Sequence, residues 1–117
     1  MTFIPKDCGF STALAIIGGK WKVDILCELQ KTPRRFGRLR QLIPGISEKM
    51  LAQQLREMEA DGLVRREVHD ASPPKVVYSL TEHGHTLNDG VASLCQWGEC
   101  HLRRTQRAPN EPVLQLI

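Results

Sequence analysis

The sequence predicts an α+β domain that is mainly α, and three observations favour this fold class. Most of the chain places apolar residues at helical spacing, whereas only residues 63–68 and 75–80 have the composition of β-strands. A Pro-Gly pair forces a short turn between two of the helical segments. The chain has 117 residues and 41% hydrophobic content, which predicts a single domain, residues 1–117, with a modest core.

Two helices are predicted ahead of this turn. The first covers about residues 9–17, with Ser11 as its cap, and ends at a Gly-Gly pair. The second covers about residues 20–30 and ends at Thr32-Pro33, because a proline disfavours a helical residue before it. Cys27 is most simply a core residue of this second helix. The apolar residues at helical spacing beside it are Trp21, Ile25, Leu26 and Leu29.

A pair of helices at about residues 35–61 encloses the turn. The chain reverses at Pro44-Gly45, and Ser47 is then the expected N-cap of the second helix of the pair. Gly62 ends that helix. The first helix of the pair has a narrow apolar stripe between arginines, made of Phe36, Leu39 and Ile43.

The helix that follows Ser47 has two distinct sides. At about 100° per residue, Leu55 and Met58 fall close to Leu51, so this side is expected to face the core. The opposite side is polar and nothing else in the chain is predicted to cover it. Its residues are Lys49, Gln53 and Arg56.

The C-terminal half is predicted to be a hairpin followed by a long helix. The hairpin covers about residues 63–80, and prolines stiffen the loop between its strands. Thr81 begins the long helix, which continues to about residue 105. One side of this helix is apolar and includes Leu87, Val91, Leu94, Trp97, and His101 or Leu102.

Helix, short turn, capped helix and hairpin follow one another in the order of a winged helix-turn-helix domain. Because the major groove of B-DNA admits one α-helix, the N-terminal half of the helix after Ser47 is expected to lie against base edges. Lys49 suits guanine acceptors or a phosphate, and the amide of Gln53 suits adenine. The expected base-reading residues are Ser47, Lys49, Met50, Gln53 and Gln54.

Positive charge is concentrated around this pair of helices. Between Lys31 and Lys49 there are six basic residues and one acidic residue, a local charge of +5 in a chain whose net charge is +3. Such a face is typical of a module that binds a polyanion, and a solvated helix surface is the simpler alternative. The residues expected to contact the DNA backbone without reading sequence are Arg34, Arg35, Arg38, Arg40, Arg56 and Lys75.

Residues 18–26, 34–68 and 73–84, with one cysteine shortly before the first helix, resemble the HxlR family of bacterial winged-helix transcription regulators, relatives of MarR-type repressors. The resemblance covers roughly residues 8–97. It implies a cytoplasmic homodimer that binds pseudo-palindromic DNA, with the first and last helices at the two-fold interface. Some members sense electrophiles or oxidants through the cysteine near the N-terminus, which is Cys8 here, and others have no known signal.

The long last helix favours a dimer independently of this resemblance. Its apolar side needs a cover that a chain this short does not supply, and a second copy would provide it. Two recognition helices would then contact successive major grooves, about 34 Å apart. A monomer whose last helix folds back on its own core is the alternative. The expected interface residues are Ala13, Ile16, Ile17, Leu87, Val91, Leu94 and Trp97.

The cysteines leave several interpretations open. Cys8 precedes a helix N-terminus, which favours the reactive thiolate, so it is the candidate sensor of a small electrophile or oxidant. An inert small hydrophobe is the alternative at this position. Cys95 and Cys100 point about 140° apart on one helix, which excludes an easy disulfide between them. A disulfide between one of them and Cys8 of a second copy, across a two-fold axis, is a further interpretation.

Other classes of function have little support. No phosphate loop, paired acids or nucleophile with a matched histidine indicates an enzyme, and no spacing indicates a metal site or cofactor. The chain has no apolar run or leader typical of a membrane or secreted protein, so we expect it in the cytoplasm with free thiols. We therefore expect a sequence-specific transcription regulator that binds double-stranded DNA. A winged-helix module for protein contacts is the alternative.

Overall fold

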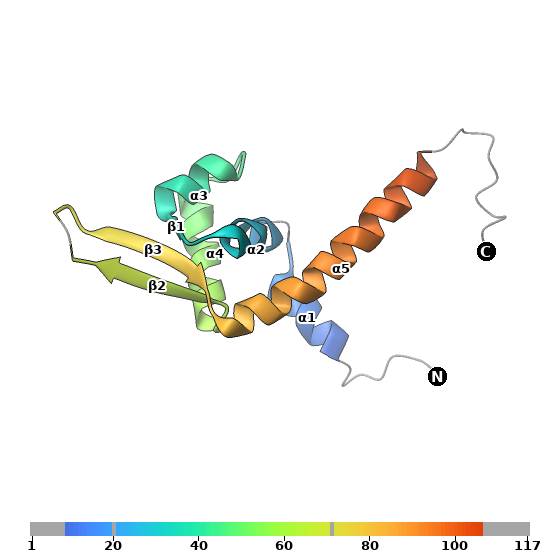
Figure 1. Ribbon diagram of the computed structural model, residues 1–117, viewed down its shortest axis with the longest axis horizontal. Coiled ribbons are helices and arrows are strands. Elements are labelled where there is room, and N and C mark those ends of the chain that lie inside the picture. Colours follow the sequence, from blue (N-terminus) through green and yellow to red (C-terminus); the bar gives the residue numbers. More distant parts are fainter. Residues whose placement is uncertain (1–8, 20, 71, 107–117) are drawn as a thin grey trace.

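The computed structural model describes residues 9–19, 21–70 and 72–106. Within these residues the chain forms five helices and three short strands (Figure 1). This arrangement confirms the predicted class, α+β and mainly α, and the predicted winged helix-turn-helix order. The elements are α1 (Gly9–Ile17), α2 (Trp21–Lys31), β1 (Arg34–Arg35), α3 (Phe36–Leu42), α4 (Glu48–Ala60), β2 (Val64–His69), β3 (Lys75–Leu80) and α5 (Glu82–Thr105).

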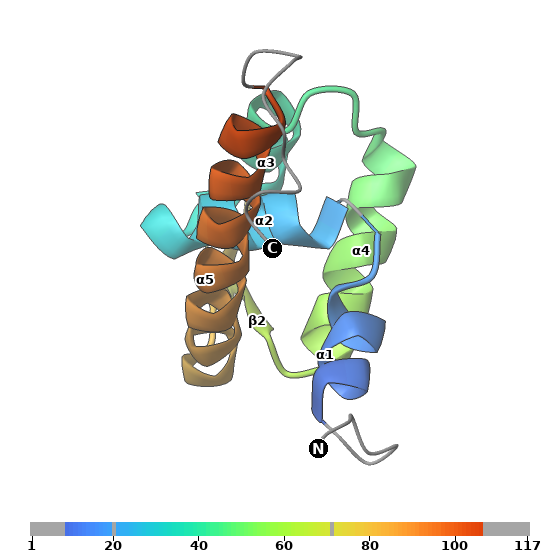
Figure 2. The same cartoon turned by 90° about the vertical axis from the view of Figure 1, so that its right-hand side faces the viewer.

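The body of the molecule consists of α2, α3 and α4, which pack around one core. The wing, made of β2, β3 and the loop between them, projects from one end of this body, and α5 projects from the other (Figure 1). Seen at right angles to that view, α2 lies between α4 and α5 (Figure 2). Trp21 packs against the core, as predicted. The largest fully buried side chains are Ile25, Leu26, Leu39, Ile43, Leu51, Leu55 and Met58.

The sheet has three antiparallel strands in the order β1-β3-β2. The hairpin of β2 and β3 was predicted, but β1 was not, because two residues carry no periodicity. Arg34 pairs with Tyr78 and Arg35 with Val77, so β1 uses the edge of β3 that β2 leaves free. This pairing ties the start of the helix pair to the wing.

Local signals fix the ends of most helices. Ser47 caps α4 as predicted, with its Oγ accepting a hydrogen bond from the Met50 backbone N–H at 3.0 Å. Gly45 has a φ of +84°, which a residue with a side chain rarely adopts, so it makes the turn before α4 possible. The start of α1 differs from prediction: the helix already includes Gly9, so Ser11 lies inside it and is not its cap.

One prediction about burial is wrong, and one residue predicted for the dimer interface is already covered within its own chain. Cys27 is exposed and does not lie in the core. It follows Leu26 by about 100°, which turns it away from the core-facing side of α2 and toward α5. Val91, expected at a dimer interface, is only 5% exposed in the single chain, because it packs into the core of its own chain where α5 crosses α2.

Candidate DNA interface

The outer side of α4 is uncovered among the described residues. Lys49, Gln53 and Arg56 are exposed along it, whereas the opposite side is buried in the core. This division follows the 3.6-residue period that the sequence predicts. The turn at Gly45 and the cap at Ser47 fix where α4 begins, so its N-terminal half is held rigidly with its polar side outward.

The other three residues of the predicted base-reading set already have partners in the chain. The hydroxyl of Ser47 is engaged as the cap of α4. Met50 is half-buried and packs against the core, and its Sδ accepts a hydrogen bond from Gln54 Nε2 at 3.4 Å. Met50 and Gln54 are half-buried at the flank of the outer side, whereas Lys49 and Gln53 are exposed on it.

A network that the sequence did not reveal holds Gln53. Its Nε2 donates to Glu57 Oε2 at 3.2 Å, and Glu57 Oε1 lies 2.6 Å from Lys22 Nζ on α2. The hydrogen bond from Lys22, followed by that from Gln53, lowers the pKa of the Glu57 carboxyl. Glu57 therefore stays ionised and holds one end of the Gln53 amide, which leaves the Gln53 carbonyl oxygen for another partner.

Lys22 is the buried end of this network, with 9% of its surface exposed. A buried ammonium requires a partner, and Glu57 supplies it from the neighbouring helix. One sequence signal points to this arrangement. Lys22 precedes Leu26 and Leu29 by four and seven residues, so it lies on the core-facing side of α2, where a lysine needs a carboxylate close by.

Most of the predicted backbone-contacting residues are exposed. Arg38 and Arg40 lie on α3, Arg35 on β1 and Lys75 at the start of β3. Arg38 makes a hydrogen bond to the side chain of Gln41 at 3.0 Å, an exposed contact that water or a phosphate can replace. Together with Arg56 on α4, these residues give the helix-turn-helix and the sheet exposed positive charge.

Arg34 differs from the other predicted backbone contacts. Its Nε donates to the Glu28 backbone oxygen and its guanidinium to Glu28 Oε1, both at 3.2 Å. Only 16% of its side chain is exposed. The structure thus engages Arg34 in joining β1 to α2, because its short strand places it beside the end of that helix. We therefore do not propose a phosphate contact for Arg34.

The wing contributes a basic residue that the sequence did not single out. Residues that pair directly across strands share one face of a sheet, so Arg35, Val77 and Glu67 face the same way. By alternation along the strands, Arg65 and Lys75 lie on this face as well, and both are exposed. The β2–β3 register puts Arg65 and Lys75 on this face, and the pairing with β1 adds Arg35, which no local pattern in the sequence indicates.

The residues predicted for a dimer interface fall into two groups. Leu94 and Trp97 on α5 are 51% and 65% exposed. Leu14 on α1 and Leu102 on α5 also expose large apolar surfaces. Apart from the buried Val91, the other predicted interface residues are half-buried. Each of them contacts the core or lines a cavity of about 350 Å³ between α1 and α5. They are Ala13, Ile16, Ile17 and Leu87.

Some predictions concern other kinds of site. Cys8, the candidate sensor, lies outside the described residues. In the described ranges, no three histidine, cysteine, aspartate or glutamate side chains come together as a metal site. None of the described helices combines the length and apolar character needed to cross a membrane.

Known proteins are similar to this chain in both sequence and fold. The HTH-type transcriptional regulator YtcD of Bacillus subtilis is 50% identical over 91 residues, which cover 78% of this chain and 72% of YtcD. A MarR-family transcriptional regulator from Enterococcus faecalis superposes with a TM-score of 0.80 at 40% identity, covering 92% of this chain and 98% of that one. The redox regulator HypR in its reduced form gives a TM-score of 0.74 at 46% identity, covering 78% and 90%.

The family model described as HxlR-like helix-turn-helix matches residues 16–106, which include every element from α2 to α5. With its capped recognition helix, its wing and these relatives, the chain belongs to the HxlR-like helix-turn-helix family and is a transcriptional regulator of the helix-turn-helix type.

Proposed function

We propose that the chain acts as a homodimer that binds a pseudo-palindromic operator and reads its sequence with α4. The observation that carries this proposal is the exposed polar side of α4, which is capped at its start, together with exposed basic residues on α3, β1 and the wing. In the major groove, Lys49 would approach guanine acceptors or a phosphate, and Gln53 would approach adenine.

Phosphate contacts would come from the residues around α4. Arg38, Arg40 and Arg56 lie on the two helices of the helix-turn-helix, and the sheet adds Arg35, Arg65 and Lys75. These contacts position the protein on the duplex and carry no sequence information of their own. Because each neutralised phosphate releases counterions, the affinity should fall steeply as the salt concentration rises.

The exposed apolar surface of α5 supports the dimer. Leu94, Trp97 and Leu102 leave more than half of their surface exposed, which a second copy would cover by pairing the same side of its own α5. This arrangement would leave both α4 helices free, because α4 and α5 lie on opposite sides of α2 (Figure 2). Successive major grooves about 34 Å apart would then receive them.

A redox or electrophile response through Cys8 also belongs to this proposal. It is supported by the position of Cys8 directly before α1 and by the likeness to a protein named as a redox regulator. The Cys8→Ser variant should keep its DNA binding while losing any release by diamide or a quinone. Release that persists in this variant would move the sensor to another residue.

Two substitutions separate sequence reading from backbone attraction. Gln53→Ala should relax base preference at one position of each half-site, because the amide that pairs with that base is removed. Arg38→Ala should weaken binding to every sequence alike. It should also reduce the slope of log affinity against log salt by about 1 for each phosphate that is no longer neutralised, or about 2 for a dimer. Arg104→Ala, at the far end of α5, is the charge-matched control and should change neither quantity.

Binding to the upstream intergenic DNA, measured by fluorescence anisotropy against a panel of operator variants and salt concentrations, tests these expectations. Equal weakening by Gln53→Ala on all sequences would contradict the reading role of α4. Affinity that hardly changes with salt would instead favour the alternative, a winged-helix module for protein contacts.

A further inference from the structure

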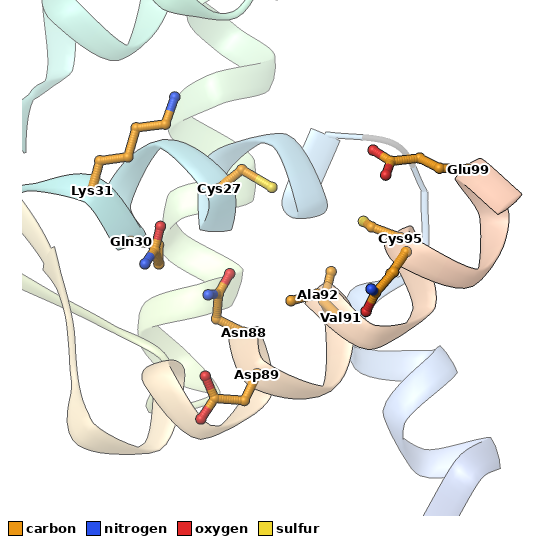
Figure 3. Close-up of a pocket in the computed structure, with 10 residues that line it drawn as sticks. Cys27, Gln30, Lys31, Asn88, Asp89, Val91, Ala92, Cys95 and Glu99 are labelled. Carbon is orange, nitrogen blue, oxygen red and sulfur yellow. The ribbon is translucent and has the colours of Figure 1, made fainter.

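A cavity of about 630 Å³ lies between α2 and α5, on the side of α2 away from the helix-turn-helix core (Figure 3). Two cysteines from different helices line it: Cys27 on α2 and Cys95 on α5. Figure 3 shows both side chains directed into this cavity from opposite walls. Both are free thiols with exposed surface, so a ligand from solvent can reach them.

Cys95 acts on the thiol of Cys27. Partial burial is the main reason that the pKa of the Cys27 thiol is raised, and the second is the negative charge that Cys95 would carry as a thiolate. Asp24 and Glu28 act in the same direction. A cation between the sulfurs would remove the repulsion between the two thiolates, because both negative charges would then face the same positive centre.

The other lining residues restrict which cation fits. Asp89 and Glu99 also line the cavity, but among the described residues no three histidine, cysteine or acidic side chains come together as a metal cage, so this is not the four-ligand site that structural zinc requires. The amides of Gln30, Asn88 and Gln96 also line the cavity, and they are weak ligands for soft ions. Thiolates select soft ions such as monovalent copper, which can be held by two of them.

We propose that Cys27 and Cys95 form a two-thiolate binding site for a soft monovalent cation, Cu⁺ or Ag⁺, between α2 and α5. On binding, each thiol releases its proton to solvent and its sulfur forms a bond to the ion, which is neither oxidised nor reduced. The resulting group carries one negative charge. Lys31, which also lines the cavity, supplies a nearby positive charge.

The site does not depend on DNA binding. Cys95 lies about 100° around α5 from Leu94, on the wall of the cavity that faces α2. Its effect would be mechanical, since an ion bound to both helices would fix α5 against α2. In this way the ion would hold the long helix at one angle to the helix-turn-helix.

Competition for Cu⁺ tests the site directly. The reduced full-length protein, without oxygen, is titrated against the Cu⁺ complex of bicinchoninate, whose colour reports the copper that the protein removes. The wild-type chain should take up one Cu⁺. Cys27→Ser and Cys95→Ser should each weaken this binding about 100-fold or more, because the remaining thiolate loses the advantage of a second ligand held nearby.

Cys100→Ser is the matched control, since Cys100 is also exposed on α5 but lines a different cavity, beside Trp97. It and Cys8→Ser should bind Cu⁺ as the wild type does. X-ray absorption at the copper edge should show two sulfur neighbours. The proposal would be overturned if Cys27→Ser or Cys95→Ser bound Cu⁺ as tightly as the wild type, or if either control lost Cu⁺ binding. Nitrogen or oxygen ligands in the coordination shell of the copper would overturn it as well. DNA binding enters none of these measurements, so their failure leaves the proposed regulator function intact.

Discussion

Replacement of Gly84 by alanine tests how the wing is joined to α5. Thr81 caps α5 by accepting from the Gly84 backbone N–H at 3.0 Å, and its own hydroxyl donates to the Gly62 carbonyl. Gly84 therefore lies directly over the chain that leaves α4. A Cβ at Gly84 would overlap the Leu63 carbonyl oxygen and lie 3.1 Å from the Leu63 carbonyl carbon. That carbonyl cannot move easily, because it accepts the Thr81 backbone N–H at 3.0 Å.

The size of the effect follows from two opposing contributions. Forcing an extra methyl into a packed site costs about 1–3 kcal/mol, whereas alanine favours a helix over glycine by about 1 kcal/mol. Gly90→Ala is the matched control in the same helix, because no neighbouring atom lies within 4 Å of a Cβ there. The helix preference is common to both variants. The difference between their free energies of unfolding therefore isolates the steric cost, about 1–3 kcal/mol.

Urea denaturation followed by circular dichroism, at one protein concentration for all variants, measures this difference. Gly84→Ala should unfold at lower urea than Gly90→Ala. Gly98, where a Cβ also has no neighbour within 4 Å, provides a second control. If all three variants shifted the unfolding midpoint by the same amount, the close packing of α5 on the Leu63 carbonyl would be refuted.

Three further predictions concern α4 and α5. Glu57→Gln should destabilise the protein most at neutral pH and less in acid. Because the pKa of the Glu57 carboxyl is lowered in the folded protein, the ionised carboxyl stabilises the fold above the ordinary glutamate pKa. This stabilisation is lost as the pH falls through the pKa of the folded state. A stability difference that stayed constant down to acid pH, measured by urea denaturation, would argue against the ionised network. Ser47→Ala should lower the free energy of unfolding by about 1 kcal/mol, because the α4 cap is lost. A midpoint of thermal unfolding equal to that of the wild type would contradict this role of Ser47. Trp97→Glu should shift the proposed dimer to monomer in sedimentation. Gln96→Glu, which adds the same charge on the side of α5 that faces the cavity with α2, should not, and equal effects of the two would place the interface elsewhere.

The sequence was most informative wherever a contact is local. The two-sided character of α4 follows from its period, so Leu51 was expected inside and Gln53 outside, and the structure agrees. The cap at Ser47 and the turn at Gly45 depend on residues within three or four positions, and they were also predicted correctly. Such features are set by backbone geometry and neighbouring side chains alone.

Features that join distant segments were missed or misjudged. Cys27 was assigned to the core because it lies between apolar residues, but the angle at which α5 crosses α2 leaves it in a cavity beside Cys95. Arg34 was grouped with the other arginines, although the short strand β1 places it against Glu28. In both cases the neighbour lies on another element, so the local pattern does not reveal it.

The sequence by itself thus determined the class of fold, the limits of most elements and the residues that α4 turns outward, because helix and strand periods and caps are local properties. Only the tertiary structure decided that Lys22 reaches Glu57, that β1 joins the sheet and that two thiols line one cavity between α2 and α5. These outcomes depend on how helices and strands cross, and the crossing is set by the packing of the whole core.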